Sequence, residues 1–218
     1  MRNVSIKGFL LLSIVVLVLS GCATSRSTVD IKVSPGTNPA NGKEVKIVQI
    51  TDGRKFEVAP KTQSIPSLNE EEIKDSKITS RAIGRKRNTY GKAMGDFMLP
   101  EQRTVQDLVR EAMTKALREK GYSVVEQSSA SYQNGLPLEA DIGTLWAYIT
   151  PGFWSLTLEF ETIVRIKGNV FPTSNEEQIR GYAQMSVQTG AESNWIETIQ
   201  NGIDDFIKNL KEKLKSAN

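Results

Sequence analysis

The chain of 218 residues contains no histidine and a single cysteine, Cys22. Histidine is the commonest general base and metal ligand in proteins, so its absence removes the usual Ser–His–Asp and Cys–His catalytic arrangements and the common zinc sites. One cysteine cannot form a disulfide within its own chain. Chemistry based on carboxylates is what the composition leaves open, and we expect neither a cofactor nor a metal.

Long apolar runs are scarce too, and the longest lies near the amino terminus. Residues 9–19, FLLLSIVVLVL, follow two basic residues and precede the small residues Ser20 and Gly21. A charged start, a short apolar run and a small-residue cleavage site predict a secretory signal peptide over residues 1–21. The run is shorter than the roughly 20 residues that cross a bilayer core. An uncleaved membrane anchor is the alternative interpretation.

The single cysteine directly follows this segment. The sequence Leu-Ser-Gly-Cys at residues 19–22 resembles the lipobox of bacterial lipoproteins, which implies diacylglycerol on the Cys22 thiol, cleavage before it, and a further acyl chain such as palmitate. Two or more acyl chains give stable anchoring. Ala23 and Thr24 follow, and the absence of Asp there favours the periplasmic face of the outer membrane over the inner membrane. A secreted protein with a free thiol is the alternative.

The mature chain is nearly neutral. Removal of residues 1–21 leaves 197 residues and lowers the formal charge from +3 to +1. Such a charge argues against nucleic acid as a partner, because that binding depends on neutralising phosphates. The length suits one domain.

Two stretches lack sustained hydrophobic periodicity. Residues 22–44 are rich in Ser, Thr, Pro, Gly and Asn, which predicts a flexible tether after the lipidated cysteine, although residues 29–33 could pair as an edge strand. Residues 54–101 predict a long loop insert in a single domain that spans residues 45–218. Loops of this length are usually functional or disordered.

Two segments have the periodicity of amphipathic helices. Apolar residues within 105–117 recur at i, i+3, i+4 and i+7, which is one face of a helix. Thr104 and Asp107 approximate a capping box at its start. A second apolar stripe predicts a carboxy-terminal helix over residues 194–215, beginning at Asn194.

Alternating or β-rich segments predict strands. They cover residues 45–50, 122–126, 138–149, 154–167 and 178–188. Strict alternation within 138–149 would place Ala140, Ile142, Trp146 and Tyr148 on one face. The order is β, long insert, α, β, β, β, β, α. It predicts an α+β fold, with a mostly antiparallel sheet of four to five strands and two amphipathic helices on one face.

The helix–Gly-Tyr–strand unit TVQDLVREAMTKALREKGYSVVE resembles the YajG-type bacterial lipoproteins and, more loosely, small α/β periplasmic lipoproteins such as LptE and LpoB. The resemblance covers residues 45–53 and 103–215. It rests on apolar and Gly-Tyr packing positions: Val105, Leu108, Ala116, Leu117, Gly121, Tyr122 and Val124. It therefore implies a fold and no activity. The insert at 54–101 and the TPGFW turn depart from the family pattern.

A basic cluster lies in the insert. Its members are Arg81, Arg85, Lys86, Arg87 and Lys92. One interpretation is an anion-binding or partner-binding patch for LPS phosphates, peptidoglycan carboxylates or an acidic protein. The alternative is a solvated basic loop balanced by the nearby acidic run at residues 70–72.

Aromatic residues flank the Thr-Pro-Gly turn at residues 150–152. Phe153 and Trp154 are candidate docking residues, because Trp and Tyr are enriched at interface hot spots. Burial of these aromatics in the core under the helices is the alternative.

The sequence favours a non-enzymatic, lipid-anchored binding or structural lipoprotein of the bacterial cell envelope. Its partners would be the membrane lipid through Cys22 and an envelope protein, peptidoglycan or LPS. An auxiliary subunit of a lipid or LPS transport assembly is a second interpretation. A carboxylate-based envelope hydrolase is a third, with Glu159 and Glu161 on one strand face as the carboxylate pair, although a solvated face explains the same pattern.

The cysteine carries the first testable prediction. Cys22→Ala should accumulate as unprocessed precursor, because in lipoproteins acylation of that thiol precedes cleavage. Immunoblotting of fractionated cells measures the mass and the location of the protein. Normal processing and outer-membrane fractionation of the variant would contradict the lipobox.

Overall fold

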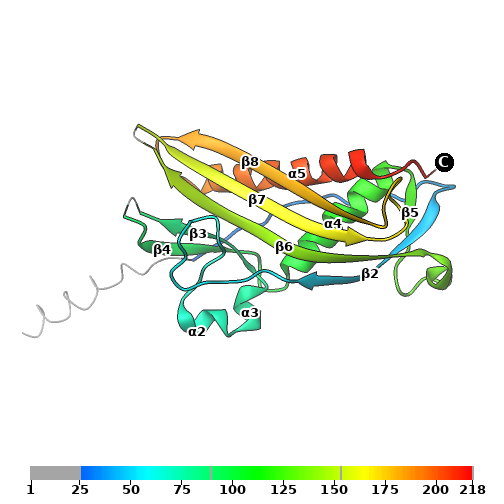
Figure 1. Ribbon diagram of the computed structural model, residues 1–218, viewed down its shortest axis with the longest axis horizontal. Coiled ribbons are helices and arrows are strands. Elements are labelled where there is room, and N and C mark those ends of the chain that lie inside the picture. Colours follow the sequence, from blue (N-terminus) through cyan, green and yellow to red (C-terminus); the bar gives the residue numbers. More distant parts are fainter. Residues whose placement is uncertain (1–25, 89, 153, 218) are drawn as a thin grey trace, which may run out of the picture.

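The computed structural model describes residues 26–88, 90–152 and 154–217. Figure 1 shows a long twisted sheet with helices behind it. In chain order the elements are β1 (Ser27–Thr28), β2 (Lys43–Asp52), α2 (Glu70–Ile73), α3 (Ser76–Thr79), β3 (Ala82–Arg87), β4 (Ala93–Met98), α4 (Val105–Glu119), β5 (Tyr122–Val124), the 3₁₀ turn η1 (Tyr132–Asn134), β6 (Leu136–Pro151), β7 (Leu156–Lys167), β8 (Glu176–Val187) and α5 (Glu192–Lys213).

All the longer strands are organised around β6. One edge of β6 pairs in parallel first with β2 and then, at Gly84 and Ala147, with β3; the other edge pairs antiparallel with β7, which pairs with β8. The described sheet thus has eight strands and is mixed. The predicted sheet of four to five mostly antiparallel strands is wrong in strand number and in direction, although its element order β2, α4, β5, β6, β7, β8, α5 is confirmed.

The parallel contact between β3 and β6 is close because Gly84 has no side chain. A Cβ atom at Gly84 would lie 2.8 Å from the Cβ of Ala147 and 2.9 Å from its carbonyl oxygen. Cβ atoms do not approach neighbours so closely, so the strand needs glycine here.

A β-bulge in β6 shifts by one residue which of its side chains face the main core. The ladder to β7 shifts between Ile142 and Thr144, which leaves Gly143 as the extra residue. Before the bulge, Ile142 points into the main core; after it, Trp146 and Tyr148 point to the other side of the sheet. A bulge adds one residue and so inverts the alternation. The prediction that these residues share one face is therefore wrong.

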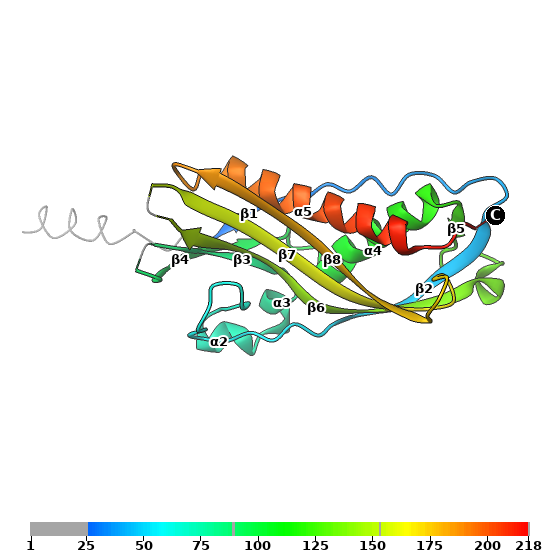
Figure 2. The ribbon, with the colours of Figure 1, turned by 45° about the horizontal axis from the view of Figure 1, so that its top comes forward.

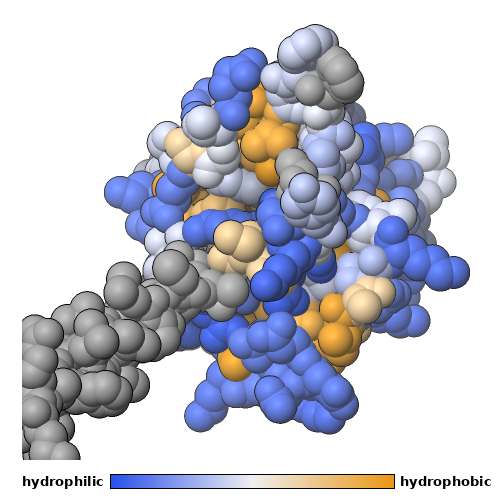
Figure 3. Space-filling model, turned by 90° about the vertical axis from the view of Figure 1, so that its left-hand side faces the viewer, coloured by the Kyte–Doolittle hydropathy of each residue, from blue (hydrophilic) through white to orange (hydrophobic). Residues whose placement is uncertain are grey.

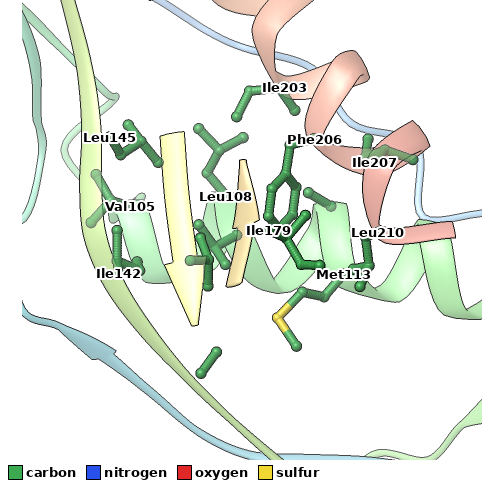
Figure 4. Packing of buried hydrophobic residues seen from close by; sticks show 14 of the residues in the cluster. Val105, Leu108, Met113, Ile142, Leu145, Ile179, Ile203, Phe206, Ile207 and Leu210 are labelled. Carbon is green, nitrogen blue, oxygen red and sulfur yellow. The ribbon is translucent and has the colours of Figure 1, made fainter. Parts of the chain in front are cut away.

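The main core lies between the sheet and helices α4 and α5. Figure 4 shows Leu108 and Met113 of α4 and Phe206 of α5 pointing toward Ile142 of β6 and Ile179 of β8. Both helices lie on one face of the sheet (Figure 2), as the sequence predicts.

Each helix has a local reason for its position. Thr104 and Asp107 form the expected capping box of α4. Helix α5 begins two residues before the predicted Asn194, after Ala191, without a side-chain cap. It crosses the sheet at Gly202, where a Cβ atom would lie 2.3 Å from the ring of Phe160.

Helix α5 also covers part of the exposed edge of β8. Asp205 accepts a hydrogen bond from the Tyr182 backbone N–H (3.0 Å), and Asn209 donates one to the Arg180 carbonyl (2.8 Å). Satisfying outward-facing backbone groups in this way protects an edge strand against unintended pairing.

The segment predicted as a loop insert contains regular secondary structure. Residues 54–101 contain α2, α3 and the β3–β4 hairpin. They build a second, smaller core on the opposite face of the sheet, where Leu68, Ala82 and Met98 surround Trp146. Helices α2 and α3 have only four residues each, too few to show a helical period in the sequence. Strand β3 begins with four consecutive buried residues, so it does not show the alternation of a half-buried strand.

Arg54 connects this second core to the sheet. Its side chain is buried and all five N–H groups donate hydrogen bonds, to the Asp52 carboxylate and to the carbonyls of Thr79, Ala82 and Leu145. A buried guanidinium that is fully paired in this way holds the insert against β6.

The amino-terminal segment packs onto the domain instead of forming the predicted tether. Val29 and Ile31 are buried in the main core, and Ser27 pairs with Phe97 in a parallel β1–β4 contact. Asn38 exchanges hydrogen bonds with Val124 at the β5 edge. The possible edge pairing of residues 29–33 thus falls slightly earlier, at β1.

The signal segment and Cys22 lie outside the described residues. Within residues 26–88, 90–152 and 154–217, none of the helices combines the length and the apolar character that crossing a bilayer requires.

The core assignment gives a prediction for stability. Phe160→Ala and Leu108→Ala should each lower the free energy of unfolding by about 2–5 kcal/mol, because both side chains are fully buried. Val48→Ala, at an exposed position of β2, should change it by less than about 0.5 kcal/mol. Urea denaturation measures all three. Equal midpoints for the core and surface variants would contradict the packing.

Candidate functional site

The predicted basic cluster lies on the β3–β4 hairpin and not in a solvated loop. Four of its five side chains have partners inside the protein: Arg81 donates to the Leu99 carbonyl, Arg85 to Asn69, Lys86 to Ser27, and Arg87 to Ser67 and the Gly91 carbonyl. Lys92 is exposed at the turn. The alternation of β3 directs neighbouring basic residues to different surroundings, so the five do not form one patch.

Arg85 belongs to a group of four charges, of which Arg85 and Asp96 are buried. Its Nε lies 3.3 Å from Oδ1 of Asp96, and both residues are 5% exposed. Arg26 lies between Asp96 (3.6 Å) and Glu72, with which it forms a hydrogen-bonded ion pair. We call Arg26, Glu72, Arg85 and Asp96 the charge cluster. It joins the amino-terminal segment, α2 and the β3–β4 hairpin.

The charge cluster lines a cavity of about 340 Å³ together with Asn69 and Gly95. Burial raises the pKa of Asp96, the Arg85 guanidinium opposes that rise, and Glu72 adds to it. The facing Nε of Arg85 and Oδ1 of Asp96 are not aligned as a hydrogen bond. The two positive and two negative groups balance within the cavity, so the arrangement is suited to internal pairing.

The candidate docking aromatics have different positions. Trp146 is buried against Phe56 in the second core, with ring centroids 5.8 Å apart and nearly perpendicular planes. Tyr148 is half-buried. Trp154 is 83% exposed beyond the end of β6, as a docking residue requires, whereas Phe153 lies outside the described residues.

The face of β6–β8 opposite the long helices carries an ordered polar network around Glu159. The Glu159 carboxylate accepts hydrogen bonds from Tyr148 (3.0 Å), Tyr182 (2.6 Å) and Thr150. Burial opposes its ionisation, but the three hydrogen bonds outweigh burial and lower the pKa of Glu159. Burial and the bond to Glu159 raise the pKa of Tyr182 to about 12, so both tyrosines remain donors at neutral pH.

The network continues across this face. Arg180 forms an ion pair with Glu161 and stacks over the Tyr182 ring, 4.4 Å from its centroid. Further along, Arg165 and Lys167 pair with Glu176. We call this surface of β6–β8, from Tyr148 to Lys167, the open sheet face.

Two hollows flank the open sheet face. One, of about 290 Å³, lies between β2, β6 and β7 and is lined by Glu139, Asp141, Arg165 and Lys167 among others. The second, of about 300 Å³, lies between residues 62–64 and the end of β6. Fixed tyrosine and arginine side chains beside hollows are features of macromolecular contact surfaces.

The chemistry of these groups does not assemble a catalytic centre. A carboxylate hydrolase needs one acid of raised pKa beside a second carboxylate, but the pKa of Glu159 is lowered and Glu161 is paired with Arg180. Among the described residues, no group of three or more acidic side chains is placed to hold a metal ion.

Sequence reasoning missed Arg54 and the role of Glu159. The Asp-Gly-Arg run at residues 52–54 has only a turn signal, and the alternation of β7 indicates a wet face without showing that Tyr148 and Tyr182 converge on it. Those contacts depend on cross-strand register.

The charge cluster yields a second stability prediction. Arg85→Ala should lower the free energy of unfolding by about 3–5 kcal/mol, because it removes the buried partner of the Asp96 carboxylate and leaves only the partly exposed Arg26 beside it. The loss should shrink as pH falls, since protonation of Asp96 removes the unpaired charge. Lys92→Ala, at an exposed position of the same hairpin, is the matched control and should change stability by less than about 0.5 kcal/mol. Chemical denaturation at two pH values measures both. A harmless Arg85→Ala would show that the pair adds nothing.

Comparison with known proteins leaves the family open. No family model matches the chain, and no curated protein matches it. Among solved structures, an uncharacterised protein aligns with a TM-score of 0.41 and 6% identity over 86% of this chain and 97% of its own. Protein XCC0632 from Xanthomonas campestris, of family DUF330, aligns with a TM-score of 0.37 and 8% identity over 86% of this chain and 91% of its own. Scores this low carry no argument on function, and the resemblance to YajG-type lipoproteins stays a prediction.

Proposed function

We propose that this protein is a lipid-anchored lipoprotein of the bacterial envelope, of YajG type, that faces the periplasm from the outer membrane and binds another envelope component without catalysing a reaction. The observation that carries the proposal is the lipobox-like sequence ending in Cys22, the only cysteine. Ala23 and Thr24 after it favour the outer membrane.

The position of the next residues supports an anchored domain. Arg26 is held in the charge cluster and Ser27 in the sheet. Only three residues lie between Cys22 and Arg26, so their Cα atoms are at most about 14 Å apart. An acylated Cys22 would therefore hold the folded domain beside the bilayer surface.

The open sheet face supports the binding role. Tyr148 and Tyr182 are held by Glu159, and Arg180 is held by Glu161. A partner therefore meets side chains that are already ordered. Binding to ordered groups loses less conformational freedom than binding to mobile ones. The face presents both charge signs, which suits a polar macromolecule. The lowered pKa of Glu159 argues against a general acid.

Site-specific photocrosslinking in intact cells tests the proposal. A photoreactive amino acid replaces Gln184, which is exposed on the open sheet face, or Lys208, which is exposed on α5. We expect adducts from position 184 and none from position 208, because only the sheet face presents the ordered network. Muramidase digestion distinguishes a peptidoglycan adduct from a protein adduct, and mass spectrometry identifies the protein.

Two results would contradict the proposal. Equal labelling from positions 184 and 208 would mean that the sheet face has no partner. Absence of acyl chains on Cys22 in the mass spectrum of the mature protein would remove the anchor.

A further inference from the structure

The turns of two hairpins lie at one end of the molecule. Strands β3 and β6 are parallel and meet at Gly84 and Ala147, so the β3–β4 turn and the β6–β7 turn project in the same direction. Figures 1 and 2 both place these turns at the left-hand end. We call residues 88, 90–94, 151, 152, 154 and 155 together the turn end.

The amino-terminal segment enters the domain from the same direction. Strand β1 is parallel to β4, with Ser27 opposite Phe97, and β4 runs away from its turn. Arg26, which precedes Ser27, therefore lies on the turn side of that pair, beside Asp96. Cys22 is at most about 14 Å of chain from Arg26, so an acylated Cys22 would bring the turn side of this pair to the bilayer.

Apolar side chains are exposed at this end. Five large apolar side chains are exposed among the described residues, and three of them belong to the turn end: Tyr90 at 94%, Trp154 at 83% and Met94 at 48%. Met94 stands at the irregularity between the pairs Lys86–Gly95 and Arg87–Ala93, which takes it out of the regular ladder. Figure 3 looks onto this end and shows apolar patches among hydrophilic side chains.

We propose that the turn end rests on the bilayer surface, with Tyr90, Met94 and Trp154 at the level of the lipid headgroups; this deepens the proposed function and rests on it. Tyr and Trp are the side chains enriched at membrane–water interfaces, because each has an apolar body and a polar tip. Exposed Lys92 in the β3–β4 turn is placed to attract anionic headgroups. The acyl chains fix where the protein is held, and the turn end fixes its orientation, with the long axis of the sheet directed away from the membrane.

The three tryptophans provide a native probe. Trp146 and Trp195 are buried and Trp154 is exposed, so lipid-borne quenchers reach Trp154 alone if the turn end touches the bilayer. The acylated protein is reconstituted into phosphatidylethanolamine–phosphatidylglycerol vesicles that contain a phospholipid brominated near the headgroup or near the bilayer centre. Flotation of the vesicles confirms attachment in the same samples.

We expect stronger quenching by bromine near the headgroup than by bromine at the centre, and its loss in Trp154→Phe. Tyr90→Ser should weaken the quenching, whereas Val48→Ser, which removes an exposed apolar side chain from β2, should leave it unchanged. Wild-type protein that floats but is quenched no more than Trp154→Phe would overturn the orientation and leave the anchor intact. Wild-type protein that fails to float would overturn the anchor itself, and the orientation with it.

Discussion

The bulge at Gly143 is the constraint on which the arrangement depends. It shifts the alternation of β6 by one residue, so that Ile142 before it and Leu145 after it both face the main core while Trp146 enters a second core on the other face. Because the second half of β6 buries side chains on both of its faces, both sides of the sheet receive cover: α4 and α5 on one, the insert on the other. One edge of β6 also pairs with β2 and then with β3. This single strand therefore positions the insert, the hairpins and the open sheet face.

The amino-terminal segment is fixed to the domain within a few residues of Cys22. Arg26 enters the charge cluster with Asp96 and Glu72, and Val29 and Ile31 enter the main core. A chain fixed so soon after Cys22 leaves little length for a tether, so an acyl anchor would hold the domain close to the membrane and at a restricted angle. A freely tethered domain could present any face to a partner. In the account proposed here, the turn end meets lipid and the open sheet face remains free for another envelope component.

Much of the fold could be predicted from local pattern. The stripe of α4, the alternation of β7 and the apolar run of α5 each have a single period over many residues, and the structure confirms them. What failed depended on distant contacts. The alternation of β6 is inverted at Gly143, and the buried Arg85 of β3 resembles a surface residue until Asp96 is placed beside it. The aromatic residues at the Thr-Pro-Gly turn are adjacent in the sequence, so they can be recognised as docking candidates. The Glu159 network cannot be predicted in this way, because its contacts depend on the register of β6, β7 and β8.

Spin labels at the two ends of the sheet test the central claim, that the turn end faces the membrane. Single cysteine substitutions at Tyr90, in the β3–β4 turn, and at Asn134, exposed in η1 at the start of β6, are labelled in the acylated, vesicle-bound protein, in which acylation blocks Cys22. Collision rates with dissolved oxygen and with a water-soluble nickel complex report depth. We expect the label at position 90 to be reached by oxygen and shielded from nickel, and the label at position 134 to be open to nickel. Equal and fully aqueous exposure at both positions would contradict it.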